Sequence, residues 1–216
     1  MSETPAPVKQ NDKSDAGKDS AWVTIETPFD TKGVSAFLDD VERLFRINSQ
    51  LVFEDWQSLG NGEYSFKAKN LSNDKTVQTR FMATRQGSTL MVTYRDGLKT
   101  TTTFRLDPNP GAPGGLVNLT VTDDYSGTPA EEREARIDEV DKSLVQWGHD
   151  LRKYLLAWKK WAWVPGWKLY MRRVWQPMRP MARRICYMLI IITFLEFVAF
   201  LMVFIIFWLE LDKYFG

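Results

Sequence analysis

Few side chains in this chain could carry out acid–base or metal chemistry. It contains one histidine, His149, and one cysteine, Cys186. A zinc site made of cysteine and histidine alone needs three or four such ligands, so counting alone excludes one. We expect His149 to be a structural residue at the edge of a helix rather than a general base. A lone cysteine cannot form an internal disulfide, which agrees with a reducing compartment. We therefore expect no metal and no cofactor.

Two pairs of neighbouring carboxylates are the other candidates for chemistry. They are Glu54 with Asp55 and Asp123 with Asp124. Neighbouring residues on a strand point to opposite faces, so neither pair can form a catalytic dyad. We expect both pairs to be solvated strand ends, and we predict no catalytic residue.

One further carboxylate, Glu196, lies within a long apolar run. The run extends from Ile185 to Leu209. As a helix it would be roughly 37 Å long, enough to cross a hydrocarbon core about 30 Å thick. We predict a transmembrane helix over 185–209 and a short tail over 210–216. An ionised carboxylate near the bilayer centre costs at least ~2.5 kcal/mol, so Glu196 should be protonated or paired. It could contact a basic or polar group of another membrane protein or a polar headgroup such as that of a quinone, or it could be protonated and face a second copy of this chain.

The segment before this run is basic and rich in tryptophan. From Leu151 to Arg184 there are ten basic residues and no acidic one, whereas the first 150 residues carry 17 basic and 24 acidic side chains. Basic residues stay on the cytoplasmic side and bind anionic lipids, which are a simpler partner here than nucleic acid. We predict a cytoplasmic N-terminal part, a juxtamembrane segment over 161–184 and an interfacial helix over 166–176, although these tryptophans could instead pack on a partner protein. The side chains expected at the membrane surface are Lys159, Lys160, Trp161, Trp163, Trp167, Arg172, Arg173, Trp175, Arg183 and Arg184.

The remaining sequence separates into a polar start and a region with regular periodicity. Residues 1–20 lack the apolar stretch of a secretory signal, and we expect a disordered extension there. Residues 21–30 alternate like a strand, and 30–46 show helical spacing. From Leu51 to Tyr125 the period is two, with turn signals at 60–62 and at Asp96–Gly97, so we predict a meander of about six strands.

A long amphipathic helix should close this region. It should begin near Thr128 and continue to about Trp161, packing across the concave face of the curved sheet. Its apolar stripe consists of Ile137, Val140, Leu144, Trp147, Leu151, Leu155 and Trp158. The fold class is therefore α+β.

This order of elements over residues 21–160 resembles the helix-grip fold of the START-like superfamily, also called SRPBCC. Two stretches, FLDDVERLFRINSQLVFEDW and LVQWGHDLRKYL, look like bacterial sequences of that superfamily. The resemblance implies a domain that encloses an apolar cavity and binds lipids, sterols, quinones or polyketides. Some members catalyse cyclisation or hydrolysis, and one membrane-associated member is an accessory protein of carbon monoxide dehydrogenase. Fold alone does not choose among these roles.

Two functions of different class therefore remain open. The domain could bind or transfer a hydrophobic ligand, lipid-like or quinone-like, at the cytoplasmic surface of a bacterial inner membrane. It could instead be a non-catalytic accessory subunit that assembles with an integral membrane complex, for example a redox complex, through Glu196 and the tryptophan-rich juxtamembrane segment. Alternation does not show whether the core is solid or hollow. Candidate cavity walls are Phe53, Trp56, Tyr64, Phe66, Phe81, Met91, Tyr94, Phe104, Trp147 and Leu151.

Overall fold

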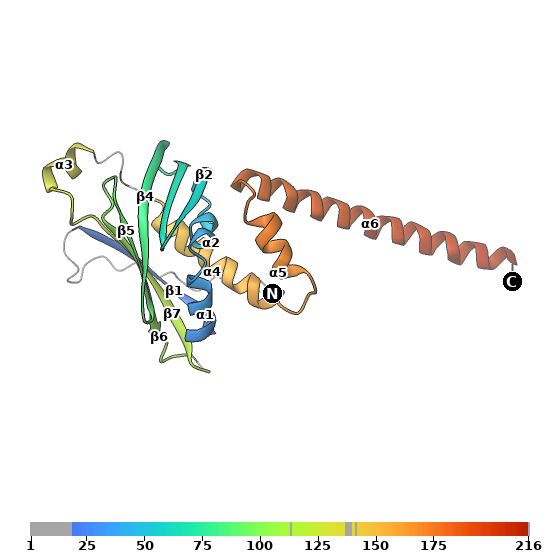
Figure 1. Ribbon diagram of the computed structural model, residues 1–216. Helices are drawn as coiled ribbons and strands as arrows, with labels where there is room; N and C mark the ends of the chain where they lie inside the picture. Colours follow the sequence, from blue (N-terminus) through green and yellow to red (C-terminus); the bar gives the residue numbers. More distant parts are fainter. Residues whose placement is uncertain (1–18, 113, 137–139, 141, 216) are drawn as a thin grey trace. The chain divides into compact units, whose positions relative to one another are not determined.

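The computed structural model of the chain describes residues 19–112, 114–136, 140 and 142–215, with side chains described up to Glu210. The expected disordered extension, 1–20, lies almost wholly outside the described residues. The chain divides into two compact units, one ending at Pro177, called the head below, and one beginning at Met178 (Figure 1).

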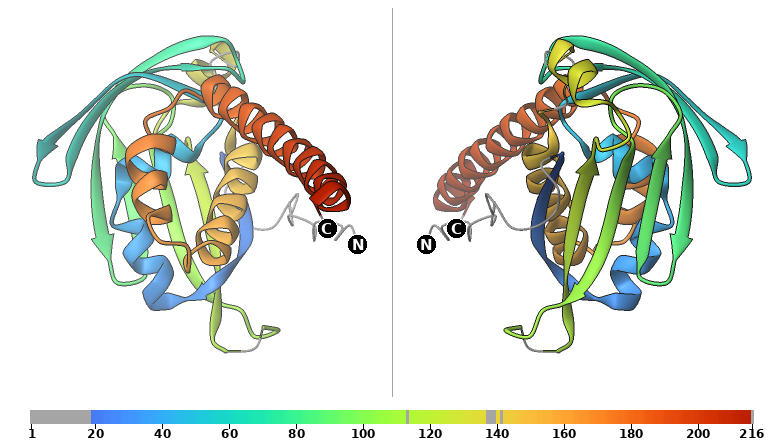
Figure 2. Two further views of the ribbon diagram at one scale, coloured as in Figure 1. Left: turned by 90° about the vertical axis from the view of Figure 1, so that its right-hand side faces the viewer. Right: turned by 90° about the vertical axis from the view of Figure 1, so that its left-hand side faces the viewer.

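The head contains a seven-stranded antiparallel sheet. Its strand order is β1-β7-β6-β5-β4-β3-β2, so that six consecutive strands form the predicted meander and β1 pairs with the last of them. The sheet curves strongly, and helices lie within its concave side (Figure 2). The strands are β1 Ser20–Asp30, β2 Leu51–Gly60, β3 Glu63–Asn70, β4 Lys75–Gln86, β5 Thr89–Tyr94, β6 Thr101–Pro108 and β7 Leu116–Asp124.

Period-two alternation determines which face of each strand is buried. In β1, for example, Val23, Ile25 and Thr27 are buried while their neighbours are less covered. The β2–β3 hairpin turns at Asn61 and Gly62, both with positive φ. A Cβ at Gly62 would lie 2.8 Å from the carbonyl oxygen of Ala83, so this turn requires glycine.

The predicted helix over 30–46 is two helices. They are α1 Thr31–Leu38 and α2 Val41–Ile47. The Asp30 carboxylate caps α1 by accepting from the Gly33 N–H at 2.8 Å, and the Asp40 carboxylate caps α2 by accepting from the Arg43 N–H at 3.2 Å. The single-helix prediction was wrong because an internal aspartate starts a new helix when its side chain binds the backbone.

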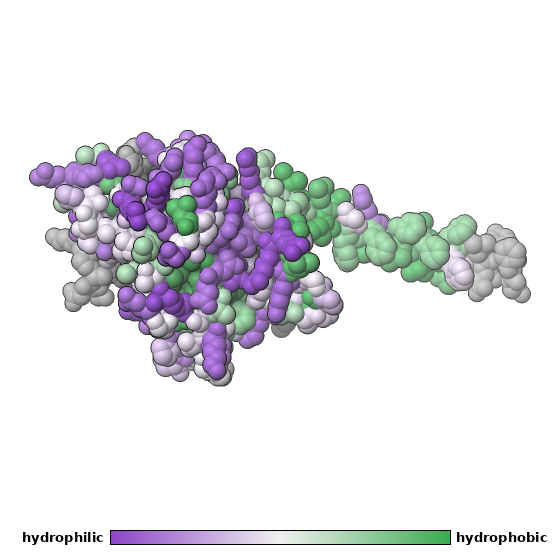
Figure 3. Space-filling view, viewed as in Figure 1, coloured by the Kyte–Doolittle hydropathy of each residue, from purple (hydrophilic) through white to green (hydrophobic). Residues whose placement is uncertain are grey.

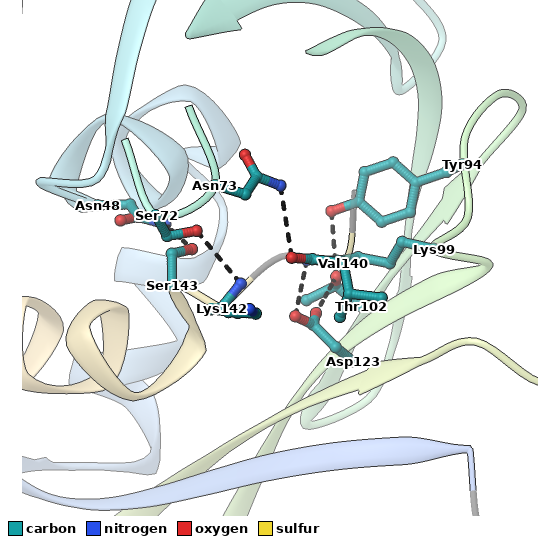
Figure 4. A network of polar contacts seen from close by, with 10 residues as sticks. All are labelled: Asn48, Ser72, Asn73, Tyr94, Lys99, Thr102, Asp123, Val140, Lys142 and Ser143. Atoms are coloured by element: carbon teal, nitrogen blue, oxygen red, sulfur yellow. Dashed lines mark hydrogen bonds and ion pairs between the residues drawn. The ribbon is translucent and has the colours of Figure 1, made fainter. Parts of the chain in front are cut away.

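The predicted closing helix is also interrupted. The structure has α3 Ala130–Ala135 and, after a connecting segment, α4 Leu144–Lys160. Side chains of the β3–β4 turn hold this segment, since Asn73 donates to the Val140 carbonyl at 3.4 Å and Ser72 accepts from the Lys142 N–H at 3.2 Å (Figure 4). Val140 thus lies in a loop, and Ile137 lies outside the described residues. These bonds compete with helix geometry in a way that periodicity does not reveal.

The turn expected at Asp96–Gly97 is a longer loop. Strand β5 ends at Tyr94 and β6 begins only at Thr101. The Arg95 N–H continues to bond β4, at the Arg80 carbonyl, at 2.9 Å, so the chain needs several residues to return. A two-residue turn was therefore the wrong prediction.

Helix α4 packs on β1 through a glycine. A Cβ at Gly148 would lie 2.8 Å from a methyl of Val23, so only glycine permits this close approach. The neighbouring Trp147 is 2% exposed, whereas Gln146 faces solvent. The tryptophan contacts the rings of Phe45 and Phe104, each with centroids 5.3 Å from its own.

Two short helical pieces follow α4 within the head. They are α5 Trp167–Tyr170 and the π-helical η2 Met171–Trp175. The segment 166–176, which we predicted to be helical, is therefore largely helical. Met171 is buried, and Trp167, Tyr170 and Trp175 are half-buried against the core. Part of the tryptophan-rich segment therefore packs on the head itself, an arrangement that neither sequence interpretation considered.

The second unit is dominated by one helix, α6, which spans Pro180–Phe215. A stretch of 31 residues within it, Pro180–Glu210, is a candidate membrane span by length and composition, since its most apolar part has a mean hydropathy of 2.9 and no buried residue. Figure 3 shows hydrophobic side chains along its surface. The predicted span 185–209 lies within this stretch, and Arg183 and Arg184 belong to the first turns of α6.

Candidate ligand pocket

A pocket of about 420 Å³ opens in the head. It lies between the start of α4, the facing ends of β3 and β4, and the 95–99 loop. Its apolar walls are Phe45, Leu51, Phe66, Val77, Leu98 and Trp147. Its polar and remaining walls are Asn48, Asn70, Lys75, Thr76, Gln78, Thr79, Tyr94, Asp96, Gly97, Lys99, Tyr125 and Arg136.

The predicted cavity residues separate into three groups. Phe66, Tyr94 and Trp147 line the pocket. Met91 lies on the other face of the sheet, because its neighbours Leu90 and Val92 are the buried residues of β5. The others pack in or against the hydrophobic core and do not line the pocket; they are Phe53, Trp56, Tyr64, Phe81, Phe104 and Leu151.

The packed group fills the side of the concave face next to the pocket. Phe81 is fully buried and stacks with Phe45 at 5.1 Å and with Tyr64 at 5.4 Å between ring centroids. Trp56 stacks with Phe66 at 5.9 Å. The interior is thus tightly packed around the Phe81 ring, whereas the pocket lies beside Trp147. The alternation of apolar residues in the sequence does not predict which inward-facing side chains line the pocket.

A polar network lies behind the pocket wall at Tyr94 and Lys99, and it was missed in the sequence (Figure 4). Asp123 is 0% exposed, so the expectation of a solvated strand end was wrong for this residue. Its carboxylate is 2.7 Å from the Lys99 ammonium and accepts from the Thr102 hydroxyl at 2.5 Å. The Thr102 oxygen lies 3.0 Å from the hydroxyl of Tyr94, which lines the pocket.

A signal for this network was present in the sequence. Asp123 has the same parity as the inward-facing Leu119 and Val121, and it lies directly opposite Thr102 in the β6–β7 register. A carboxylate at an inward position must be paired, because an isolated buried charge is too costly. The network was missed because Asp123 was judged with its neighbour Asp124 rather than by its face.

A buried cation, Arg43, stabilises the junction of α1, α2 and α4. Arg43 is 3% exposed, donates to the Phe37 carbonyl at 3.1 Å and lies over the Phe37 ring at 4.4 Å. Burial lowers the pKa of Arg43, and the nearby Asp40 carboxylate opposes this. Burial also raises the pKa of the Tyr154 hydroxyl, against the opposing charge of Arg43. Both groups lie away from the pocket walls, so we assign them a structural role.

The predicted membrane-surface side chains are mostly exposed. Trp163 is 77% and Trp161 42% exposed, and the lysine and arginine side chains of the set are exposed or half-exposed. Trp167 and Trp175 differ, since they are half-buried against the head. Within the described residues, His149 is exposed and does not line the pocket, and no three potential metal ligands lie together.

Comparison with protein-family models and with curated proteins finds no match. Solved structures do match in fold. A protein of Thermus thermophilus has 13% identity and a TM-score of 0.48, covering 64% of this chain and 97% of its own. The Zhui aromatase/cyclase of a Streptomyces species has 14% identity and a TM-score of 0.48, covering 67% and 97%. A STAR-related lipid transfer protein of Xanthomonas axonopodis has 10% identity and a TM-score of 0.39, covering 69% and 98%. The predicted helix-grip architecture is confirmed by this chain's own strand order and closing helix.

Proposed function

We propose that the head binds a hydrophobic small molecule, lipid-like or quinone-like, in the pocket beside Trp147. The observation that carries the proposal is the pocket itself, about 420 Å³, which is within the range of about 300–1,000 Å³ for ligand pockets. Phe45, Phe66 and Trp147 supply flat apolar walls, and Tyr94 supplies a polar group. Such a combination holds an apolar body and orients it.

The second part of the proposal is that α6 anchors the chain in a bacterial inner membrane with the head in the cytoplasm. Its apolar length supports a span, and the basic residues that precede it support this orientation. The exposed Trp161 and Trp163, with Lys159 and Lys160, would contact an anionic leaflet. A tether of this kind raises the effective concentration of the pocket at the bilayer surface.

We assign the pocket a binding role rather than a catalytic one. The buried carboxylate of Asp123 is occupied by Thr102 and Lys99. A general base needs a lone pair directed at the reacting proton. Asp123 does not line the pocket, and its carboxylate instead pairs with Lys99, which does.

Filling the pocket should abolish ligand binding. Val77 lines the pocket from β4, and Val77→Trp would place an indole in that space. Native mass spectrometry of the full-length protein purified from membranes should show a bound small molecule in the wild type and none in this variant. The matched control is Thr84→Trp, an exposed position on the same strand, which should retain the molecule. Equal occupancy in both variants would place the ligand elsewhere.

Glu196 favours the alternative that the chain is an accessory subunit of a membrane complex. It is exposed on α6, amid the apolar stretch, which is a costly position for a carboxyl group facing lipid. On this alternative, Glu196→Leu should abolish co-migration with membrane partners on native gels. Glu196→Gln, which retains hydrogen bonding, should preserve part of it. Unchanged migration of the leucine variant would remove the support for this role.

A further inference from the structure

The helical pieces α5 and η2 have an inner face that packs on the head. Met171 is 4% exposed, and the neighbouring Trp167, Tyr170 and Trp175 are half-buried against the core. The Trp175 ring lies 5.4 Å from the ring of Tyr154 in α4, measured between centroids. Trp167 and Trp175, which we predicted at the membrane surface, therefore belong to this inner face.

The other side of α5 and η2 combines exposed apolar and basic side chains. Leu169 is 58% and Val174 is 40% exposed, although both are aliphatic. Lys168, Arg172 and Arg173 are exposed next to them in the chain. Exposed apolar side chains that gather among polar ones mark sites of interaction with a protein or a membrane.

The end of α4 continues this surface. Trp161 is 42% exposed, and its ring lies 5.7 Å from that of Trp167 in α5. The Lys160 ammonium is 5.8 Å from the Trp161 ring. The sequence from Leu151 to Arg184 contributes no acidic residue to the surface. We call the following exposed side chains the outer face: Lys160, Trp161, Lys168, Leu169, Arg172, Arg173 and Val174.

We propose that the outer face docks the head on the interfacial region of an anionic bilayer. This inference rests on the proposed membrane anchor and adds the surface through which the head itself meets the lipid. Charge complementarity favours an anionic leaflet, since each Lys or Arg close to it favours binding roughly fivefold. Leu169 and Trp161 supply the apolar contacts that interfacial segments make with lipid. Only residues 176–179 separate η2 from α6, so a bilayer that takes up α6 is within reach.

Docking through the outer face holds the pocket on the far side of the head from the bilayer. Trp147 lines the pocket near the start of α4, about 20 Å along the helix from Lys160 at its end. None of the described residues from 148 to 177 lines the pocket. Arg136, which follows α3, does line it, and α3 and α5 lie on opposite sides of the head (Figure 1). The pocket therefore exchanges its ligand with the aqueous side.

Fluorescent labels on the full-length protein in nanodiscs test this orientation. Cys186→Ser removes the native thiol, so that Leu169→Cys can carry a polarity-sensitive label on the outer face. Thr76→Cys carries the same label at an exposed position of the pocket wall. In nanodiscs that contain phosphatidylglycerol, we expect the label at 169 to shift to the blue and to be quenched by nitroxide lipids. We expect the label at 76 to keep its emission in water and to escape quenching.

The lipid and the cations assign the effect to charge complementarity. Nanodiscs of phosphatidylcholine alone should abolish most of the blue shift at 169. Replacing Lys168, Arg172 and Arg173 with glutamine should weaken docking about 100-fold and should also remove the shift. The matched control replaces three exposed cations of the sheet with glutamine and should keep it; these are Lys67, Arg80 and Arg105. Thermal unfolding of each variant checks that the head is folded.

The outcomes separate the inference from the anchor on which it rests. If the protein enters the nanodiscs and the label at 169 keeps its emission in water, docking through the outer face is overturned while the anchor stands. A blue shift at 169 without quenching means that protein covers this face, which also overturns the inference. Quenching at 76 means that the pocket meets the bilayer and overturns the orientation. If the protein stays outside the nanodiscs, the proposed anchor itself fails.

Discussion

Replacing Trp147 with alanine should lower the free energy of unfolding of the head by about 3 to 5 kcal/mol. The indole is 2% exposed and packs between the rings of Phe45 and Phe104. Its Nε1–H donates to the Leu44 carbonyl at 2.9 Å, so the substitution leaves a cavity and also a buried acceptor that loses its donor. Urea titration of the full-length protein in nanodiscs, followed by near-ultraviolet circular dichroism, measures the change.

Trp163→Ala is the matched control for that loss. Trp163 is 77% exposed, and substitutions at such positions usually change stability by less than about 0.5 kcal/mol. The comparison removes the general effect of deleting an indole. A loss below about 1 kcal/mol for Trp147→Ala would mean that the ring does not join α4 to the core.

Removing residues 178–216 should transfer the protein from the membrane to the soluble fraction. The full chain should remain in the pellet after carbonate washing, because the 31-residue candidate span of α6 contains a part with a mean hydropathy of 2.9. The truncated chain should keep only a weak attachment through its basic surface, which salt removes because screening weakens such contacts. Centrifugation of lysed cells at low and high salt measures both. A full chain found in the supernatant without detergent would contradict the anchor.

The spacing of apolar residues along the sequence allowed most of the fold to be predicted. Alternation from Leu51 to Tyr125 indicated the meander, and helical spacing around Trp147 and Leu151 indicated the closing helix. Local polar contacts determine where the predicted helices are interrupted, and the periodicity of apolar residues does not reveal these positions. Asp40 divides the first helix, and Ser72 and Asn73 hold a loop where a continuous helix was expected.

The site was less predictable than the fold for a geometric reason. Phe66 and Phe81 are both inward-facing aromatic residues, yet the first lines the pocket and the second is fully buried in the packed core. Which of them meets empty space depends on the curvature of the sheet and on the position of α4, and periodicity specifies neither. Asp123 was predictable from its parity, because an inward carboxylate requires partners such as Lys99 and Thr102.

Isotope-filtered nuclear Overhauser measurements can show whether the space beside Trp147 receives a ligand. Unlabelled 2-naphthol would be added to the isotopically labelled full-length protein in deuterated nanodiscs. We expect contacts from the probe to the rings of Trp147, Phe66 and Tyr94, which line the pocket. Contacts confined to the side chains of α6, or none in the head, would contradict this expectation.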